Sequence, residues 1–270
     1  MIRFPNAKIN LGLQITERRT DNFHNICSVF YPLGWSDALE IIPSKDFEYS
    51  QSGITISGNT EDNLIVKTYR WMKKAYDLSN VKIHLHKNIP IGAGLGGGSS
   101  DAAFTAKMLN EIFSLKLSIP EMEEIIKPLG SDCAFFIQNK PTLALQKGDE
   151  FENINVSLKG KYIVLIYPNI FVSTKEAYAG VKPQKPQFNL RNIAELPIQE
   201  WRNNLKNDFE EGIFFIYPEI AELKNQFYQL GALYSSMSGS GSTVFGIFDG
   251  PINCQKYFNK DYSIWAGALD

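Results

Sequence analysis

The stretch Pro90-Ile-Gly-Ala-Gly-Leu-Gly-Gly-Gly-Ser-Ser-Asp-Ala-Ala103 is the most informative part of this 270-residue chain. Its five glycines cost backbone entropy that an ordinary loop would avoid. They leave no side chain in the way of a bulky anion and let successive N–H groups point at one place. The residues that follow predict a helix with its body over 102–113, capped by Ser99, Ser100 and Asp101. Because a helix N-terminus carries unpaired N–H groups and a favourable dipole, the stretch predicts a phosphate-binding loop.

Two widespread nucleotide-binding motifs do not fit this loop. A P-loop needs a lysine after the last glycine, and Ser99 stands there instead. Gly92, Gly94 and Gly97 do match the dinucleotide fingerprint Gly-x-Gly-x-x-Gly. The strand expected before them, 81–86, however alternates apolar and polar residues, and a second helix rather than a strand follows the first. The sequence therefore argues against a dinucleotide-binding domain, and it lacks the landmarks of protein kinases.

The composition is that of a globular protein, with 44% hydrophobic and 21% charged residues. A formal net charge of −2 argues against nucleic acid as a partner, and the apolar runs are too short for a membrane span. The N-terminus has no signal-peptide pattern, so we expect a cytoplasmic protein. Cys27, Cys133 and Cys254 lack Cys-x-x-Cys spacing and are expected to be reduced thiols. The oligomeric state stays open.

The order of expected elements predicts an α+β fold, because strands and helices mix without strict βαβ alternation. The polar, glycine-bearing stretch 148–159 is the expected seam between two domains, 1–155 and 156–270. A last helix is expected to lead into the final strand. The other expected strands are 8–15, 25–31, 38–43, 81–86, 142–146, 161–168, 232–237 and 242–248, and the helices 61–76, 99–113, 119–128, 198–205, 208–215 and 219–230.

Three further segments have chemical character. Lys8 and Asn10 share one face of the first strand, either as a functional pair or as solvated side chains. Asp132 stands directly before a small and aromatic run, where an acid is expected at the edge of a core, as at catalytic sites, or as the cap of a short helix. The glycine-rich turn Met237-Ser-Gly-Ser-Gly-Ser-Thr243 alone predicts no more than a hairpin connection.

Taken in order, these segments resemble the GHMP small-molecule kinase superfamily. Pro5-Asn-Ala-Lys-Ile-Asn-Leu-Gly-Leu13 is similar to its first motif, 90–103 to its ATP loop, and 237–243 to its third motif. Within the superfamily the likeness is strongest to the 4-diphosphocytidyl-2-C-methyl-D-erythritol kinases of the non-mevalonate isoprenoid route. Arg19-Thr-Asp-Asn-Phe-His24 resembles their Arg-x-Asp-Gly-Tyr-His turn, and Gly130–Phe136 resembles their Asp-x-Pro-Phe-Phe segment.

The resemblance implies a ribosomal-S5-like N-terminal domain, a ferredoxin-like C-terminal domain and an active site in the cleft. It implies ATP as co-substrate with Mg²⁺, Ser99 or Ser100 being a candidate ligand. Lys8 and Asp132 are the expected catalytic residues, with Asp132 a base or an electrostatic anchor. The implied ATP-binding residues are Pro90, Ile91, Gly92, Ala93, Gly94, Leu95, Gly96, Gly97, Gly98, Ser99, Ser100 and Asn63.

The implied acceptor is a cytidine diphosphate alcohol, phosphorylated at its 2-hydroxyl. Asn22, Phe23, Asn25 and Ala134 depart from the usual family residues and leave the phosphoryl-transfer residues intact. The alternatives are a GHMP kinase of the homoserine or mevalonate type, or a nucleotide-binding module without catalysis. The implied acceptor-binding residues are Asn10, Phe23, His24, Thr174, Tyr178, Gly239 and Ser240.

Overall fold

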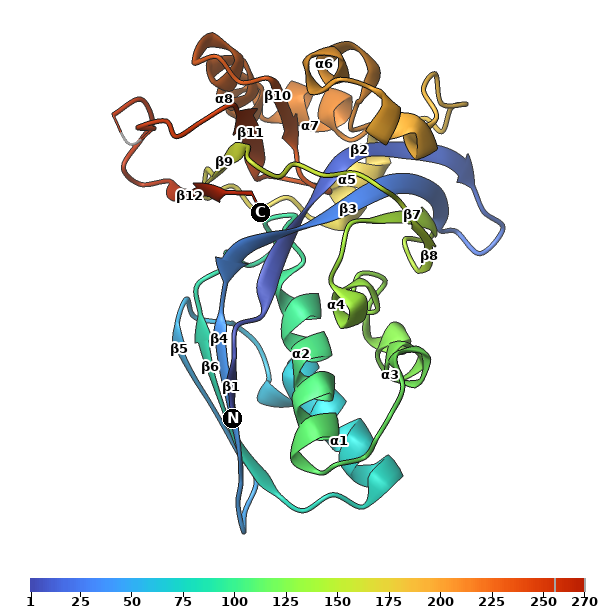
Figure 1. Ribbon diagram of the computed structural model, residues 1–270, viewed down its shortest axis with the longest axis vertical. Coiled ribbons are helices and arrows are strands. Elements are labelled where there is room, and N and C mark those ends of the chain that lie inside the picture. Colours follow the sequence, from blue (N-terminus) through green and yellow to red (C-terminus); the bar gives the residue numbers. More distant parts are fainter. Residues whose placement is uncertain (255, 270) are drawn as a thin grey trace. The chain divides into compact units, whose positions relative to one another are not determined.

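The computed structural model describes residues 1–254 and 256–269 (Figure 1). The chain divides into two compact units, and each is built from separated segments. The two domains expected from the sequence, 1–155 and 156–270, are continuous stretches of chain and so differ from these units. The division into those two domains stays a prediction. The first unit comprises Met1–Lys8, Pro32–Ile91 and Gly96–Lys140, and the second comprises Ile9–Tyr31, Gly92–Leu95 and the chain from Pro141 onward.

A four-stranded sheet with two long helices forms most of the first unit. Helices α1 (Leu64–Tyr76) and α2 (Gly97–Ile112) pack against each other, and α2 also contacts the sheet, as Figure 1 shows. Within the sheet, β6 pairs antiparallel with β4 and parallel with β5. In spatial order the strands are β1 (Ile2–Arg3), β4 (Ala38–Pro43), β6 (Val81–Lys87) and β5 (Glu48–Gly53).

Strand β6 confirms the expected alternation of buried and exposed residues. Val81, Ile83 and Leu85 are buried, whereas Lys82 and His86 are exposed. This is the pattern of a strand with one face against a core. The same alternation buries the last residue of the strand, Lys87.

Helix α2 begins earlier than the sequence analysis expects. Its N-cap is Gly96, with φ +70°, and the N–H of Ser100 already donates to the carbonyl of Gly96 over 2.9 Å. Ser99, Ser100 and Asp101 therefore lie inside the helix, and the expectation that they cap it is wrong. The N–H groups of the first helical residues, 97–99, have no partner four residues back. The earlier start thus puts the N–H groups of two glycines and one serine in the first turn, where no carbonyl of the helix accepts them.

Smaller elements complete the first unit. Helix α1 has Asn63 as its N-cap, whose side chain accepts the N–H of Ile65. Helix α3 (Ile119–Ile126) starts with a capping box between Ser118 and Glu121. One turn of helix, α4 (Phe135–Gln138), follows it, and 3-10 turns occupy 60–62 and 127–129.

Two long strands, β2 (Asn6–Arg18) and β3 (His24–Ser36), dominate the start of the second unit. Both extend beyond the expected 8–15 and 25–31. The N-terminal end of β2, up to Lys8, and the C-terminal end of β3, from Pro32, belong to the first unit. Strands β7 (Thr142–Gln146) and β8 (Glu150–Asn153) continue the sheet in the order β2-β3-β7-β8. Strand β8 was not expected, because its residues lie in the polar stretch predicted to be a seam.

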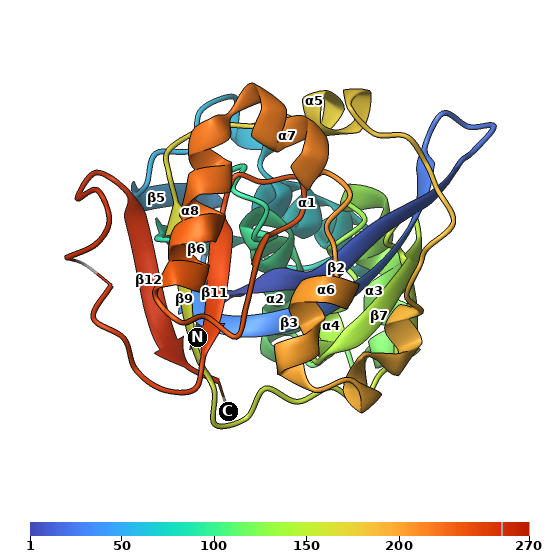
Figure 2. The ribbon, with the colours of Figure 1, turned by 90° about the horizontal axis from the view of Figure 1, so that it is seen from above.

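A second sheet of this unit has the order β10-β11-β9-β12, with every described pair antiparallel. Helix α8 (Pro218–Gln229) packs against β10 and β11, and Figure 2 shows it beside β11. No helix lies between β11 and β12 in the described residues, so the expected last helix is not found there. The strands are β9 (Tyr162–Tyr167), β10 (Tyr234–Met237), β11 (Val244–Phe248) and β12 (Ser263–Ala268).

Three short helices complete the second unit. They are α5 (Thr174–Ala179), α6 (Trp201–Asn204) and α7 (Glu210–Ile216). Helix α6 covers only part of the expected 198–205, because a 3-10 turn, 198–200, precedes it. A further 3-10 segment occupies 190–195. The three cysteines are free, as expected. Among the described helices, none has the length and apolar character needed to cross a membrane.

Phe227 tests the packing of the second unit. Its ring is fully buried beside Phe248 and Phe258, so Phe227→Ala is expected to cost about 3–5 kcal/mol of unfolding free energy. Phe215, which is 88% exposed, is the matched control, and Phe215→Ala should change stability by less than about 0.5 kcal/mol. Urea unfolding measures both, and equal effects would contradict this description of the core.

Candidate functional site

The glycine loop before α2 requires glycine for steric reasons. Gly92, Gly94 and Gly96 have φ angles of +64°, +77° and +70°, a region that other residues rarely adopt. At Gly94 a Cβ atom would lie 2.0 Å from the carbonyl oxygen of Ser238. Backbone therefore approaches backbone at this point, and no side chain fits between.

The third motif is more than a hairpin connection, because it holds the first half of the glycine loop. The Ser238 hydroxyl donates to the carbonyl of Gly94 over 2.8 Å, and the Thr243 N–H donates to the carbonyl of Ala93 over 3.3 Å. The Asn207 amide in turn donates to the carbonyls of Met237 and Gly239, each over 2.8 Å. Hydrogen bonds from the third motif thus fix the backbone of residues 92–95.

Glu210 supports the same turn from helix α7. Its carboxylate accepts the N–H of Met237 at 2.8 Å and the hydroxyl of Ser236 at 2.9 Å, and it pairs with Lys224 at 2.6 Å. The sequence analysis did not assign Glu210 or Ser238. The signal that could have found Glu210 is its place in Asn207-Asp-Phe-Glu, a stretch with three polar side chains around one apolar residue.

The start of α2 is suited to an anion. No acidic residue lies in its first turn, Gly98 is exposed, and Ser99 is half-buried. The Ser100 hydroxyl is buried and has no hydrogen-bond partner among the residues that the structure describes. The free N–H groups of the first turn and the helix dipole both favour a negative ligand here.

Lys8 and Asp132 form an ion pair beside this helix start. Lys8 Nζ lies 3.2 Å from Asp132 Oδ2, and the two side chains are 4% and 26% exposed. A Cβ at Gly96, the N-cap of α2, would lie 3.2 Å from Lys8 Cγ. The alternative of a solvated Lys8 is therefore wrong. A buried ammonium and a partly accessible carboxylate meet next to the expected phosphate site.

Asn10 and the third motif also come together. The Asn10 amide donates to the Ser28 hydroxyl at 2.8 Å, which itself donates to the carbonyl of Gly12 at 2.6 Å. A Cβ at Gly239 would lie 3.5 Å from Asn10 Oδ1. Asn10 is buried as well, so the solvated alternative fails here too. Ser240 is half-buried.

Among the residues expected to bind the acceptor, two aromatic side chains stack on each other, whereas Phe23 and Thr174 are exposed. The rings of His24 and Tyr178 stack, with centroids 4.7 Å apart and planes 13° from parallel. Burial lowers the pKa of His24, and nearby Arg18 lowers it further, which favours the neutral imidazole. Phe23 is 59% exposed and lies 5.3 Å from Lys147 Nζ, and Thr174 is exposed at the first residue of α5.

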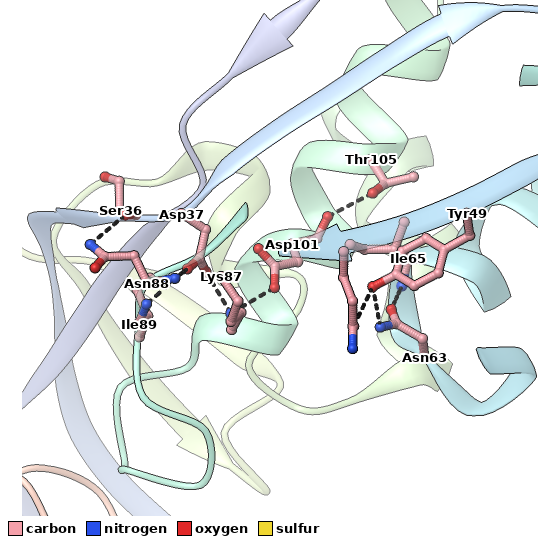
Figure 3. Close-up of polar contacts among 11 residues, drawn as sticks. Ser36, Asp37, Tyr49, Asn63, Ile65, Lys87, Asn88, Ile89, Asp101 and Thr105 are labelled. Carbon is pink, nitrogen blue, oxygen red and sulfur yellow. Dashed lines mark hydrogen bonds and ion pairs between the residues drawn. The ribbon is translucent and has the colours of Figure 1, made fainter. Parts of the chain in front are cut away.

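Asn63 borders a separate cavity. Its side chain donates to the Tyr49 hydroxyl at 2.8 Å while capping α1, as Figure 3 shows. A cavity of about 250 Å³ is lined by Tyr49, Asn59, Asn63 and their neighbours in the chain. Burial raises the pKa of Tyr49 to about 12, so its hydroxyl stays protonated.

A buried charge network was missed by the sequence analysis. Lys87 Nζ contacts Asp37 Oδ2 at 2.5 Å and Asp101 Oδ2 at 2.8 Å (Figure 3). Burial opposes the charge on Lys87, yet the carboxylates of Asp101 and Asp37 together raise its pKa. Burial also raises the pKa of Asp101 to about 7, although Lys87 acts against this shift. The signal was present in the strand, because the alternation from 81 places Lys87 on the buried face.

Two segments of the chain match models of one protein family. The family described as "GHMP kinases N terminal domain" matches residues 63–140, and "GHMP kinases C terminal" matches residues 190–262. The chain belongs to the GHMP kinase family. The expected membership in this family and the expected α+β fold are thereby confirmed, and the protein is an ATP-dependent kinase by family.

Relatives of this GHMP kinase share most of its length. A 4-diphosphocytidyl-2-C-methyl-D-erythritol kinase from Cytophaga hutchinsonii is 56% identical, over 92% of this chain and 93% of the relative. One from Bacteroides thetaiotaomicron is 52% identical over 92% of both chains. A crystal structure of 4-(cytidine 5'-diphospho)-2C-methyl-D-erythritol kinase superposes with a TM-score of 0.83 at 28% identity, covering 100% of this chain and 99% of that one.

Gly94 and Gly98 provide a matched test of the loop geometry. Gly94→Ala should lose at least about 2 kcal/mol of stability, because of its positive φ and the 2.0 Å contact with Ser238. A Cβ at the helical Gly98 would meet only one atom, at 3.9 Å, so Gly98→Ala should gain about 0.5–1 kcal/mol. Urea unfolding measures both. Similar losses in the two variants would contradict the backbone contact.

Proposed function

We propose that this GHMP kinase transfers the γ-phosphate of ATP to the 2-hydroxyl of 4-diphosphocytidyl-2-C-methyl-D-erythritol. The names of relatives that share about half of its residues over nearly the whole chain support this substrate. The observation that carries the chemistry is the Lys8–Asp132 pair, 3.2 Å apart beside the N-cap of α2. A carboxylate and an ammonium next to an anion site are the groups that phosphoryl transfer to an alcohol requires.

The glycine loop and α2 bind the nucleotide phosphates in this proposal. Residues 92–100 supply N–H groups in place of the lysine of a P-loop, and the glycines keep the approach open. Pro90, Ile91 and Leu95 complete the loop. Asn63 contributes from the cavity that it shares with Tyr49, where a part of the nucleotide other than the phosphates can lie.

Asp132 and Lys8 act on the acceptor hydroxyl. Asp132 accepts its proton as the oxygen attacks the γ-phosphorus, or holds the hydroxyl in line for attack. Lys8 holds the Asp132 carboxylate through the ion pair and offsets negative charge on the transferred group. Because carbon 2 of the acceptor carries a methyl branch, its hydroxyl is tertiary, and exact orientation matters more than for an open primary alcohol.

The residues at the start of α2 fit a magnesium ion carried by the nucleotide. The donor set is hydroxylic: Ser99 is half-buried, and the Ser100 hydroxyl lacks a hydrogen-bond partner in the described part of the chain. Mg²⁺ accepts few protein ligands and keeps several waters, so a serine hydroxyl suffices. When bound, the ion neutralises charge on the phosphate oxygens. Ser99 and Ser100 are the residues that would hold it.

The cytosine is expected at the pair formed by His24 and Tyr178. Centroids 4.7 Å apart leave no room for a base between the rings, so the base stacks on an outer face of the pair. The neutral imidazole can donate or accept a hydrogen bond to the base. Phe23 and Thr174 flank this position in the chain, while Asn10, Gly239 and Ser240 are proposed to contact the rest of the acceptor.

Two alternatives remain to be separated by experiment. Homoserine and mevalonate kinases resemble this chain at 13–18% identity, which supports the shared fold alone. A nucleotide-binding module without catalysis would have no need of the Lys8–Asp132 pair. ADP release should therefore be measured with the cytidine diphosphate alcohol, homoserine and mevalonate as acceptors. Release with either of the last two alone would overturn the substrate, and no release with any acceptor would favour the module. A cytoplasmic location stays a prediction.

The catalytic pair makes a double-mutant prediction. Asp132→Asn keeps the size of the side chain and removes the base, so kcat should fall roughly 10²–10⁴-fold while nucleotide affinity changes little. Lys8→Met should also lower kcat, because Asp132 loses its cation. Since both residues act on one proton transfer, the double variant should be scarcely slower than the slower single variant. Steady-state kinetics measures all three. Additive losses would show that the residues act independently, and near-normal kcat in Asp132→Asn would remove its catalytic role.

The acceptor pocket makes a second prediction. His24→Ala removes a stacking surface worth about 1–3 kcal/mol, so the KM for the acceptor should rise roughly 5- to 150-fold. His24→Phe keeps an aromatic ring and loses the ring nitrogens. Its KM for the acceptor should therefore lie between the values of the wild type and of His24→Ala. The KM for ATP should change less than twofold in both variants. Equal effects on both substrates would assign His24 a structural role.

A further inference from the structure

Lys87 occupies an unusual place for a lysine near a phosphate site. Its side chain is 3% exposed, and its ammonium lies between the carboxylates of Asp37 and Asp101, which are 0% and 4% exposed. A group this deeply buried cannot reach a bound phosphate directly. Any effect of Lys87 on a bound phosphate must therefore act through the residues that contact its side chain.

Asp37 connects Lys87 to the start of the glycine loop. Its second carboxylate oxygen, Oδ1, accepts the N–H of Asn88 at 2.6 Å and the N–H of Ile89 at 2.8 Å. These are the first two residues after strand β6. The carboxylate therefore fixes the direction in which the chain leaves the sheet, and the ammonium balances its buried charge.

Asp101 connects Lys87 to helix α2. It lies one turn beyond the residues whose free N–H groups face the proposed phosphate site, and its Oδ2 accepts from Lys87 Nζ at 2.8 Å. The first residue of the helix packs on the same lysine, since a Cβ at Gly97 would lie 3.0 Å from Lys87 Nζ and 3.0 Å from Ile89 Cγ2. Any larger residue here would press on both side chains, so glycine suits this close approach.

We propose that Lys87 is a positioning residue for the nucleotide phosphates, because it locks the first turn of α2 to the exit of strand β6. The inference rests on the proposed function, in which that turn binds ATP. Lys87 holds the N–H groups of residues 97–99 at fixed points relative to residues 88 and 89, where the chain leaves β6. A phosphate bound there then meets donors that need no rearrangement. Loss of the link should weaken ligands that carry phosphate and spare ligands that do not.

The test compares an ATP analogue that cannot be hydrolysed with adenosine. In the double variant Lys87→Met/Asp101→Asn, the remaining carboxylate, Asp37, keeps its two N–H donors and no second buried charge is left unpaired. We expect its affinity for the analogue to fall at least tenfold and its affinity for adenosine to change less than twofold. The KM for the acceptor should also stay within twofold. Isothermal titration and competition binding give these values.

Lys82 offers a matched control on the same strand. It is half-exposed and pairs with Glu48 at the surface, so Lys82→Met should leave both affinities unchanged. Should the double variant fail to fold by circular dichroism, Lys87→Arg keeps the charge and moves the donors, and a loss of about three- to tenfold is expected for the analogue alone. Equal loss for adenosine and the analogue, or no loss for either, overturns the inference.

The same measurements separate this inference from the proposed function. Wild-type protein that binds the analogue more tightly than adenosine, but releases no ADP with the cytidine diphosphate alcohol, would overturn the proposed substrate and leave the role of Lys87 intact. The opposite result is also possible. If the wild-type protein releases ADP with this acceptor while the double variant loses affinity for the analogue and for adenosine equally, the proposed function stands and the role of Lys87 is overturned.

Discussion

Unpaired N–H groups at the start of α2 are the feature on which the rest of the structure depends. A helix end offers such groups for geometric reasons, and they bind an anion well only if the backbone around them is fixed. Three residues with positive φ, at 92, 94 and 96, bring the chain to that point without side chains in the way. A loop so rich in glycine has little intrinsic order, so contacts with neighbouring residues must fix its conformation.

Two networks of different physical character impose it. Around residues 92–95 the neighbours are neutral: the Ser238 hydroxyl and the backbone of the third motif, itself held by Asn207 and Glu210. Around residues 88–89 and 97–101 the neighbours are charged, with Lys87 between two carboxylates. Buried charges contribute little net stability, and removal of one partner is severe. Such a network serves to define one conformation rather than to add free energy.

Prediction from sequence succeeded where one physical signal dominated. The glycines of 90–103, the alternation of 81–86 and the family motifs led to the right fold and to the Lys8–Asp132 contact. It failed where a residue's partners lie far away in the chain. Asp101 resembles a helix cap in sequence, yet α2 already starts at Gly97, and the Asp101 side chain pairs with the distant Lys87 instead. Strand β8 is polar, and pairing with β7 alone makes it a strand. The exposure of Phe23 likewise depends on how the whole turn 19–24 folds.

The interleaving of the two units along the chain has a consequence for biosynthesis. Every segment of the first unit has been synthesised once residue 140 is added, whereas the second unit needs residues from 9 onward and the strands near the C-terminus. The edge of β3 that pairs with β7 therefore stays open while more than a hundred residues are translated. An unpaired strand edge is a template for wrong association. We expect the nascent chain to be most exposed to misassembly in that interval, when the first unit is still being synthesised and the second has only its first hairpin.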